Sequence, residues 1–313
     1  MIIEPNQLIT EKFDICIVGA GIAGLCIAQS FINSHLRILI IEAGGQHWKE
    51  QDQQFYQADI VGQNYTGHSE GRYRTFGGSS IRWGGQLLPL TPMDLASRAQ
   101  TSSNGWPITL ENLLPYYKKA QVIMRVNDLP YDKALWSKLG TVPIQFDPHY
   151  FQYRYSKWAR FEHRNLAKTI GAECISAKNI SVLFNSAVVH IQLNPEANKV
   201  KHVDVCIEDG RKIPAQAKQY ILCGGTLETA RLLLASRNVC PTGVGNTHDL
   251  VGRYFQDHIS FRAAELHPNN IKRFATSFAP TFIKSIMHFP RLEFTPQAQN
   301  ELNCLGIFCT CAI

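Results

Sequence analysis

Residues 13–31 have the sequence FDICIVGAGIAGLCIAQSF, in which three glycines follow a short apolar run at set spacing. The run Phe13–Val18 is apolar, rich in β-branched residues and without a helical period, which predicts a buried strand. After Gly24 the apolar residues continue at helical spacing, and a second apolar run, LRILIIEAGG, reaches Glu42. Strand, glycine turn, helix and second strand form the context that a dinucleotide-binding turn requires.

Each part of this turn has a physical task. Gly19 permits the tight turn, Gly21 lets the backbone approach a diphosphate, and Gly24 lets the helix lie against the strand. The start of the helix then offers unpaired N–H groups and the positive end of its dipole to the phosphates. Glu42 falls where an acid accepts hydrogen bonds from a ribose, and an acid there argues against NADP. The turn alone does not distinguish FAD from NAD.

The composition describes a globular chain with a modest positive charge. Its 313 residues allow one large domain or two ordinary ones, with 45% apolar and 18% charged residues. The net charge of +6 is not concentrated in any run, so an anionic ligand explains it better than nucleic acid does. No basic leader precedes the first apolar stretch, and no segment has the roughly 18 to 20 unbroken apolar residues of a membrane span.

Nine cysteines and eleven histidines are scattered along the chain. The cysteines form no CxxC pair, and their number is odd, so we expect buried, reduced thiols and a cytoplasmic location. The histidines show no HExxH and no other ligand spacing, so we expect no metal.

A second glycine-rich stretch, GRYRTFGGSSIRWGGQLLPL, occupies residues 71–90. Small residues here allow the backbone to lie flat against a planar ligand, and hydroxyls can serve phosphate or ring heteroatoms. The stretch has no lysine to complete a P-loop, and Ile81 breaks the pattern of a nucleophile elbow. In the centre of the stretch, Gly77, Gly78, Ser79 and Ser80 are followed by Trp83, Gly84 and Gly85.

At this point the chain resembles the glucose-methanol-choline (GMC) oxidoreductases. Four blocks carry the resemblance in matching order: DICIVGAGIAGL with LIIEAGG, GRYRTFGGSSIRWGG, YILCGGTLETARLLLAS and VGRYFQDH. In that family the second block crosses the isoalloxazine of FAD. The resemblance therefore implies that the residues beside the flavin are Gly77, Gly78, Ser79, Ser80, Trp83 and Gly84. Trp83 resembles the sugar-oxidising branch, some of whose members tether the flavin through a histidine just before that tryptophan. Here the residue is Arg82, which implies non-covalent FAD.

The resemblance also assigns residues outside the two glycine turns. It implies that the backbone of Val188 meets the adenine and that Gly224 and Gly225 end a strand near the ribose and diphosphate. It places Asp257 and His258 on the nucleotide side, where they hold the flavin region and do not act as catalytic base.

The expected fold class is α/β, with a Rossmann-like FAD-binding domain on a doubly wound, mainly parallel sheet and an incomplete α+β substrate domain. We expect residues 12–45 and 180–262 to form the FAD-binding domain. Residues 46–179 would be a flavin-covering loop and helical insertion, and residues 263–313 a partial substrate-binding domain.

Local patterns add detail to this division. Thr109 with Asn112 predicts a helix start, and the aromatic segment 149–161 is interpreted as core or interface and not as a substrate surface. Residues 180–194 have the pattern of one alternating strand, and two more strands are expected across the turn at 208–211.

GMC enzymes hold their catalytic histidine in a block near the C-terminus, and this sequence has no such block, so we expect a shortened chain with unassigned catalytic residues. Three functions stay open. The first is an FAD-dependent oxidoreductase that acts on the CH–OH group of a sugar or other alcohol, with an unnamed electron acceptor. The second is an inactive remnant that binds FAD or ADP, and the third is an NAD-linked dehydrogenase.

Overall fold

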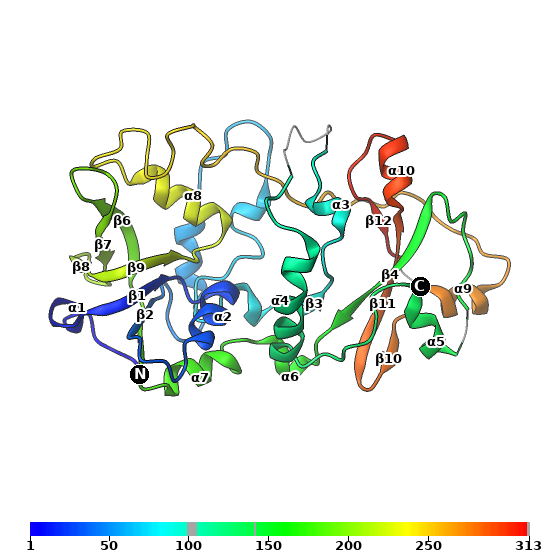
Figure 1. Ribbon diagram of the computed structural model, residues 1–313, viewed down its shortest axis with the longest axis horizontal. Coiled ribbons are helices and arrows are strands. Elements are labelled where there is room, and N and C mark those ends of the chain that lie inside the picture. The colour runs from blue at the N-terminus through cyan, green and yellow to red at the C-terminus, as the bar shows by residue number, and fades with distance from the viewer. Residues whose placement is uncertain (99–104, 141, 312–313) are drawn as a thin grey trace. The chain divides into compact units, whose positions relative to one another are not determined.

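The computed structural model describes residues 1–98, 105–140 and 142–311 (Figure 1). The chain divides into two compact units. The first unit consists of Met1–Trp83 and Asn165–Ser260, and the second unit of Gly84–Arg164 and Phe261–Ile313.

This division differs in two places from the expected domain boundaries. Residues 46–83 and 165–179, expected in a separate insertion, belong to the first unit. The second of these segments contains α7 (Ile170–Ser176), which packs against α2 (Ile22–Ser30). The rest of the expected insertion, residues 84–164, is in the same unit as the chain beyond Phe261.

A four-stranded parallel sheet organises the first unit, with strand order β5-β2-β1-β9. Its strands are β1 (Phe13–Val18), β2 (Ile38–Ile41), β5 (Ile180–Leu183) and β9 (Ala217–Leu222). The first strand, α2 and the second strand confirm the arrangement predicted around the opening glycine turn. The predicted fold class, α/β with a mainly parallel sheet, is likewise confirmed.

A three-stranded antiparallel sheet completes the first unit, with strands β6 (Ala187–Leu193), β7 (Val200–Cys206) and β8 (Lys212–Ala215). The prediction of a single strand over residues 180–194 is wrong. Asn185 has a left-handed backbone with φ of 50°, which ends β5 and lets β6 enter the other sheet. The following stretch forms three strands and not two, because β9 leaves the antiparallel sheet to pair with β1.

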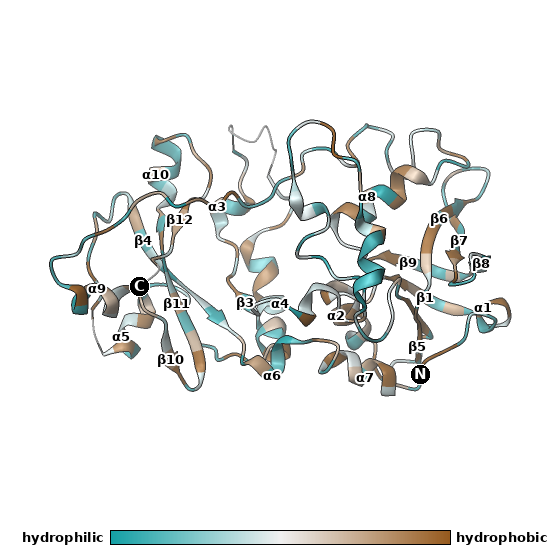
Figure 2. Ribbon diagram, turned by 180° about the vertical axis from the view of Figure 1, so that it is seen from behind, coloured by the Kyte–Doolittle hydropathy of each residue, from teal (hydrophilic) through white to brown (hydrophobic). Residues whose placement is uncertain are grey.

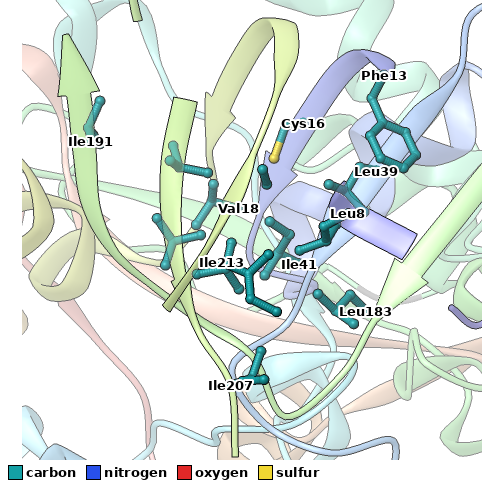
Figure 3. Close-up of a cluster of buried hydrophobic side chains, with 14 of the residues drawn as sticks. Leu8, Phe13, Cys16, Val18, Leu39, Ile41, Leu183, Ile191, Ile207 and Ile213 are labelled. Atoms are coloured by element: carbon teal, nitrogen blue, oxygen red, sulfur yellow. The ribbon is translucent and has the colours of Figure 1, made fainter. Parts of the chain in front are cut away.

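The core of the first unit lies between these two sheets (Figure 3). The parallel sheet contributes buried residues at alternate positions, among them Cys16 and Val18, and the antiparallel sheet contributes residues such as Ile213. Since side chains alternate across a strand, Ile15 and Ile17 point to the opposite face, where α2 packs. The hydrophobic colouring of α2 in Figure 2 reflects this buried position. The helix α8 (Thr226–Ala235) follows β9 and buries Leu232 in the core between the sheets.

The second unit is built on an antiparallel sheet with strand order β10-β11-β4-β3, and β12 pairs with β11. The strands are β3 (Gln86–Leu87), β4 (Phe151–Trp158), β10 (Thr281–Ile283), β11 (Ile286–Phe294) and β12 (Phe308–Cys309). Tyr153 and Tyr155 of β4 are buried in a cluster with Leu135 and Phe278. This confirms that the aromatic segment 149–161 contributes to a core.

Helices occur in both units. The helix α4 (Leu110–Ile123) begins where the sequence predicted, because Thr109 and Asn112 form a capping box in which the Thr109 N–H donates to Asn112 Oδ1 at 2.9 Å. The other α-helices are α1 (Gln7–Thr10), α3 (Pro92–Leu95), α5 (Trp136–Leu139), α6 (Phe161–Arg164), α9 (Ile271–Phe278) and α10 (Pro296–Glu301). The 3-10 helices are η1 (Glu50–Tyr56), η2 (Thr66–His68), η3 (Gly78–Ile81) and η5 (Lys133–Leu135).

Candidate functional site

A cavity of about 630 Å³ opens in the first unit, within the size range of ligand pockets. Its lining includes the residues that follow three neighbouring parallel strands, namely Gly19, Glu42 and Cys223. Ligands of open α/β sheets bind at this edge, outside the carboxyl ends of the strands. The cavity is therefore the candidate functional site.

Two glycines of the opening turn are required by the protein's own packing. Gly19 has φ of +101°, and a Cβ there would lie 2.6 Å from the carbonyl oxygen of Cys223. A Cβ on Gly24 would lie 2.0 Å from the carbonyl oxygen of Gly19. Both positions thus exclude every side chain, and Gly24 lets α2 approach the turn as the sequence predicted.

Gly21 is required by neither conformation nor packing. Its φ is −76°, which any residue adopts, and no atom of the chain lies within 4 Å of a Cβ built on it. The open space belongs to the cavity, which Gly21 lines. A side chain would fill part of the space that a ligand needs to approach the backbone, so the cavity fits a diphosphate group at this position.

The second glycine segment meets the first at this point. A Cβ on Gly78 would lie 3.0 Å from the Cα of Gly21, and the N–H of Gly77 donates to the carbonyl oxygen of Ala20 at 2.9 Å. Gly78 and Ser79 line the cavity. Two stretches that are almost sixty residues apart in sequence therefore form one wall of the site.

Two helices begin at the cavity. The first residues of α2, Ile22 and Ala23, belong to its lining, as do Gly224 and Gly225 at the start of α8. The first N–H groups of a helix have no acceptor within the helix, and they carry the positive end of its dipole. This end of the cavity therefore favours negative charge.

Glu42 lies buried at the end of β2. One carboxylate oxygen accepts from the N–H of Ala20 at 2.8 Å and the other from the N–H of Gly44 at 2.8 Å. Burial raises the pKa of Glu42 to about 7, although these N–H groups and Arg74 oppose the shift. Because a carboxylate has about four lone-pair sites, Glu42 can still accept from a ribose hydroxyl.

The structure brings together seven of the twelve predicted binding residues. Those that line the cavity are Gly19, Gly21, Glu42, Gly78, Ser79, Val188 and Gly224. Those that do not are Gly24, Gly77, Ser80, Trp83 and Gly84.

Two of the residues outside the lining have other contacts. The Ser80 hydroxyl is buried, donates to Gly77 O at 2.6 Å and accepts from the N–H of Leu166 at 3.2 Å, so it holds the loop. Gly84 belongs to the second unit, where a Cβ would lie 2.5 Å from the Trp158 ring. The prediction that these residues touch flavin has no support from the cavity.

Several of the charged residues that line the cavity were not predicted as site residues from the sequence. Arg72 Nη2 lies 3.0 Å from Glu228 Oε1, and Arg231 Nε lies 2.7 Å from Glu228 Oε2. Arg74 Nε donates to Ala43 O at 3.2 Å. The spacing of Glu228 and Arg231 on α8 signals a helical pair, but nothing local connects either residue with Arg72.

Asp257 and His258 differ in their placement. Asp257 lines the cavity and accepts from the Tyr65 hydroxyl at 2.5 Å, which lowers the pKa of the Asp257 carboxyl. The His258 side chain is 87% exposed and does not line the cavity. In the part of the chain that the structure describes, no histidine belongs to the lining.

Three further features of the described segments bear on function. Within 1–98, 105–140 and 142–311, no helix has both the length and the apolar character to cross a bilayer. The same segments contain no cluster of three metal-ligating side chains. The nine cysteines, all in described positions, are free, with Cys16 and Cys174 buried and most of the others half-buried.

Comparison with curated proteins gives two distant relatives, while no family model matches the chain. The chain is 22% identical over 335 residues to the fructose dehydrogenase large subunit of Gluconobacter japonicus, covering 82% of this chain and 61% of the relative. It is 22% identical over 301 residues to 6'''-hydroxyparomomycin C oxidase of Streptomyces lividus, covering 80% of this chain and 55% of the relative. The chain thus spans less than two thirds of either relative.

Among solved structures, the chain is similar to pyridoxine 4-oxidase from Mesorbium loti, with a TM-score of 0.46, 21% identity, and coverage of 72% of this chain and 52% of that one. It is also similar to a fungal aryl-alcohol oxidase, with a TM-score of 0.46, 17% identity, and coverage of 72% and 47%.

Proposed function

We propose that the first unit binds FAD non-covalently and that the chain is an oxidoreductase of the GMC type, acting on the CH–OH group of a sugar or other alcohol. Gly21 is the observation that carries the proposal, because the space that a side chain would fill is open to the cavity and leaves room for a ligand to approach the backbone. The relatives support the substrate class, since their names give fructose and a hydroxyparomomycin as the compounds oxidised.

The cavity residues divide among the parts of the cofactor. The N–H groups at the start of α2, beside Gly21, would hold the diphosphate, and Glu42 would accept from the ribose. The backbone of Val188 would meet the adenine. Gly78 and Ser79 would lie along the isoalloxazine, as the family resemblance implies.

Arg82 supports a non-covalent flavin. Its guanidinium lies 4.1 Å from the centre of the Trp48 ring and 5.3 Å from that of Tyr73, so it is held between two aromatic rings. A guanidinium stays protonated and is no nucleophile toward a flavin methyl group.

A reducing, cytoplasmic location is the matching expectation for a chain with nine free cysteines.

The chemistry that a bound flavin supplies is acceptance of a hydride from the carbinol carbon, and a base must take the hydroxyl proton. Because no histidine among the described residues lines the cavity, this lining would bind and orient the cofactor but offers no histidine base. This observation favours a second candidate function, nucleotide binding without turnover.

Reconstitution with FAD tests both candidates. The expected result is a yellow protein with the visible bands of oxidised flavin, from which acid or denaturant releases the flavin. Anaerobic bleaching by a panel of sugars and alcohols would support the oxidoreductase, and a yellow protein that no member bleaches would support binding without turnover. A colourless protein that binds NADH but not FAD would contradict the proposal.

A further inference from the structure

The lining of the cavity contains more acidic than basic residues. Its acids are Glu42, Glu70, Glu228 and Asp257, and its bases are Arg72, Arg74 and Arg231. A ligand with a diphosphate would be repelled by acids that nothing neutralises. The neutralisation of these acids therefore decides whether the cavity accepts an anion.

Glu228 presents this problem most directly. It lies in the first turn of α8, and a Cβ on Gly224 would be only 3.5 Å from the Cβ of Glu228. Burial raises the pKa of the Glu228 carboxyl, but hydrogen bonds from Arg231 and Arg72 reverse the shift and leave the pKa lowered. The carboxylate is thus ionised at neutral pH, beside a helix start that would otherwise favour an anion.

Arg72 contacts three separate elements at the cavity wall. Its guanidinium forms the ion pair with Glu228 on α8 and donates to the carbonyl oxygen of His68 in η2. It also lies 4.0 Å from the centre of the Tyr56 ring at the end of η1. The side chain is 20% exposed, so these contacts fix its conformation in a partly desolvated position.

We propose that Arg72 is a positioning residue that makes the α8 end of the cavity select ligands with a diphosphate over uncharged ones, by neutralising Glu228. With Arg231 the three side chains carry a net charge of +1, and without Arg72 they carry none. The inference rests on the proposed nucleotide binding. It identifies Arg72, a charged residue of the second glycine-rich stretch, as a determinant of which ligands the cavity prefers.

The test compares ADP with adenosine, each displacing FAD in a competition titration. Arg72→Gln should weaken ADP binding about two- to fivefold and adenosine binding less than about twofold, the size expected for one partly exposed charge. Glu228→Gln should strengthen ADP binding about two- to fivefold and leave adenosine unchanged. Arg211→Gln breaks an exposed ion pair with Asp209 outside the cavity and should change neither.

The double variant Arg72→Gln/Glu228→Gln separates charge from structure. If Arg72 acts by neutralising Glu228, removing the charges of both residues should restore ADP binding to within about twofold of the wild type. A residue that only held η1 and η2 in place would show no such rescue. Equal losses of ADP and adenosine in Arg72→Gln, or no rescue in the double variant, would overturn the inference. A wild-type protein that bound neither FAD nor ADP would instead overturn the proposed function.

Discussion

At the scale of the residue, the three glycines of the opening turn have separate physical reasons. Gly21→Ala should leave the free energy of unfolding within about 1 kcal/mol of the wild type, because the backbone tolerates alanine there. The same change should weaken FAD binding at least about tenfold, since the methyl group enters the cavity. Gly24→Ala should destabilise the fold by about 1–3 kcal/mol or more through its clash with Gly19 O. Urea unfolding and FAD titration measure both, and a stable Gly24→Ala or a tightly binding Gly21→Ala would contradict the assignment.

A second prediction at the scale of the residue concerns Glu42 and the pH dependence of stability. The pKa of Glu42 is about 7 in the folded chain against 4.5 for an unperturbed glutamic acid, so between these pH values the folded state binds more protons than the unfolded state. Stability from this group is therefore present at low pH and lost as the pH rises from about 4.5 to 7. The free energy of unfolding of the wild type minus that of Glu42→Gln should fall by about 2–3 kcal/mol across this window. A flat difference in urea unfolding would show that Glu42 is not desolvated.

At the scale of the element, β4 and β11 contain a buried pair of residues whose effect on the pH dependence of stability is opposite to that of Glu42. Lys157 and His288 are direct cross-strand partners, both fully buried, and the His288 Nε2 lies 3.1 Å from Asn127 Nδ2. Burial, and then the charge of Lys157, lowers the pKa of His288 to about 4 from 6.5. Burial lowers the pKa of Lys157 to about 8, an effect that the nearby Asp128 opposes, and the Tyr131 ring lies 3.9 Å from Lys157 Nζ.

The unfolded second unit should therefore bind a proton that the folded unit does not between pH 6.5 and 4. The contribution of His288 to the free energy of unfolding should be complete above pH 6.5 and should fall by up to about 3 kcal/mol as the pH drops to 4. His288→Leu should lose this acid sensitivity. Urea unfolding at a series of pH values measures the difference, and identical acid profiles for the two proteins would refute it.

The elements also show what the sequence could predict. The segment β1, α2 and β2 was predictable because apolar period, glycine spacing and flanking strands agree in one stretch of chain. The separation of β5 from β6 was not predictable, because it depends on the left-handed backbone of Asn185, and the presence of an asparagine does not by itself show that its backbone is left-handed. Likewise, Arg72 and Glu228 are 156 residues apart, so no local pattern joins them.

At the scale of the whole molecule, every residue that lines the cavity belongs to the first unit, although the chain passes through the second unit between Gly84 and Arg164. A bound ligand slows the hydrogen exchange of backbone N–H groups in segments whose local unfolding it suppresses. ADP should therefore slow exchange of the backbone N–H groups of residues 19–24 and 224–229, which surround the starts of α2 and α8. The N–H groups of β4 and β11 should keep their rates and serve as the internal control. Protection confined to β4 and β11 would place the nucleotide in the second unit, and Gly21 would then need another explanation.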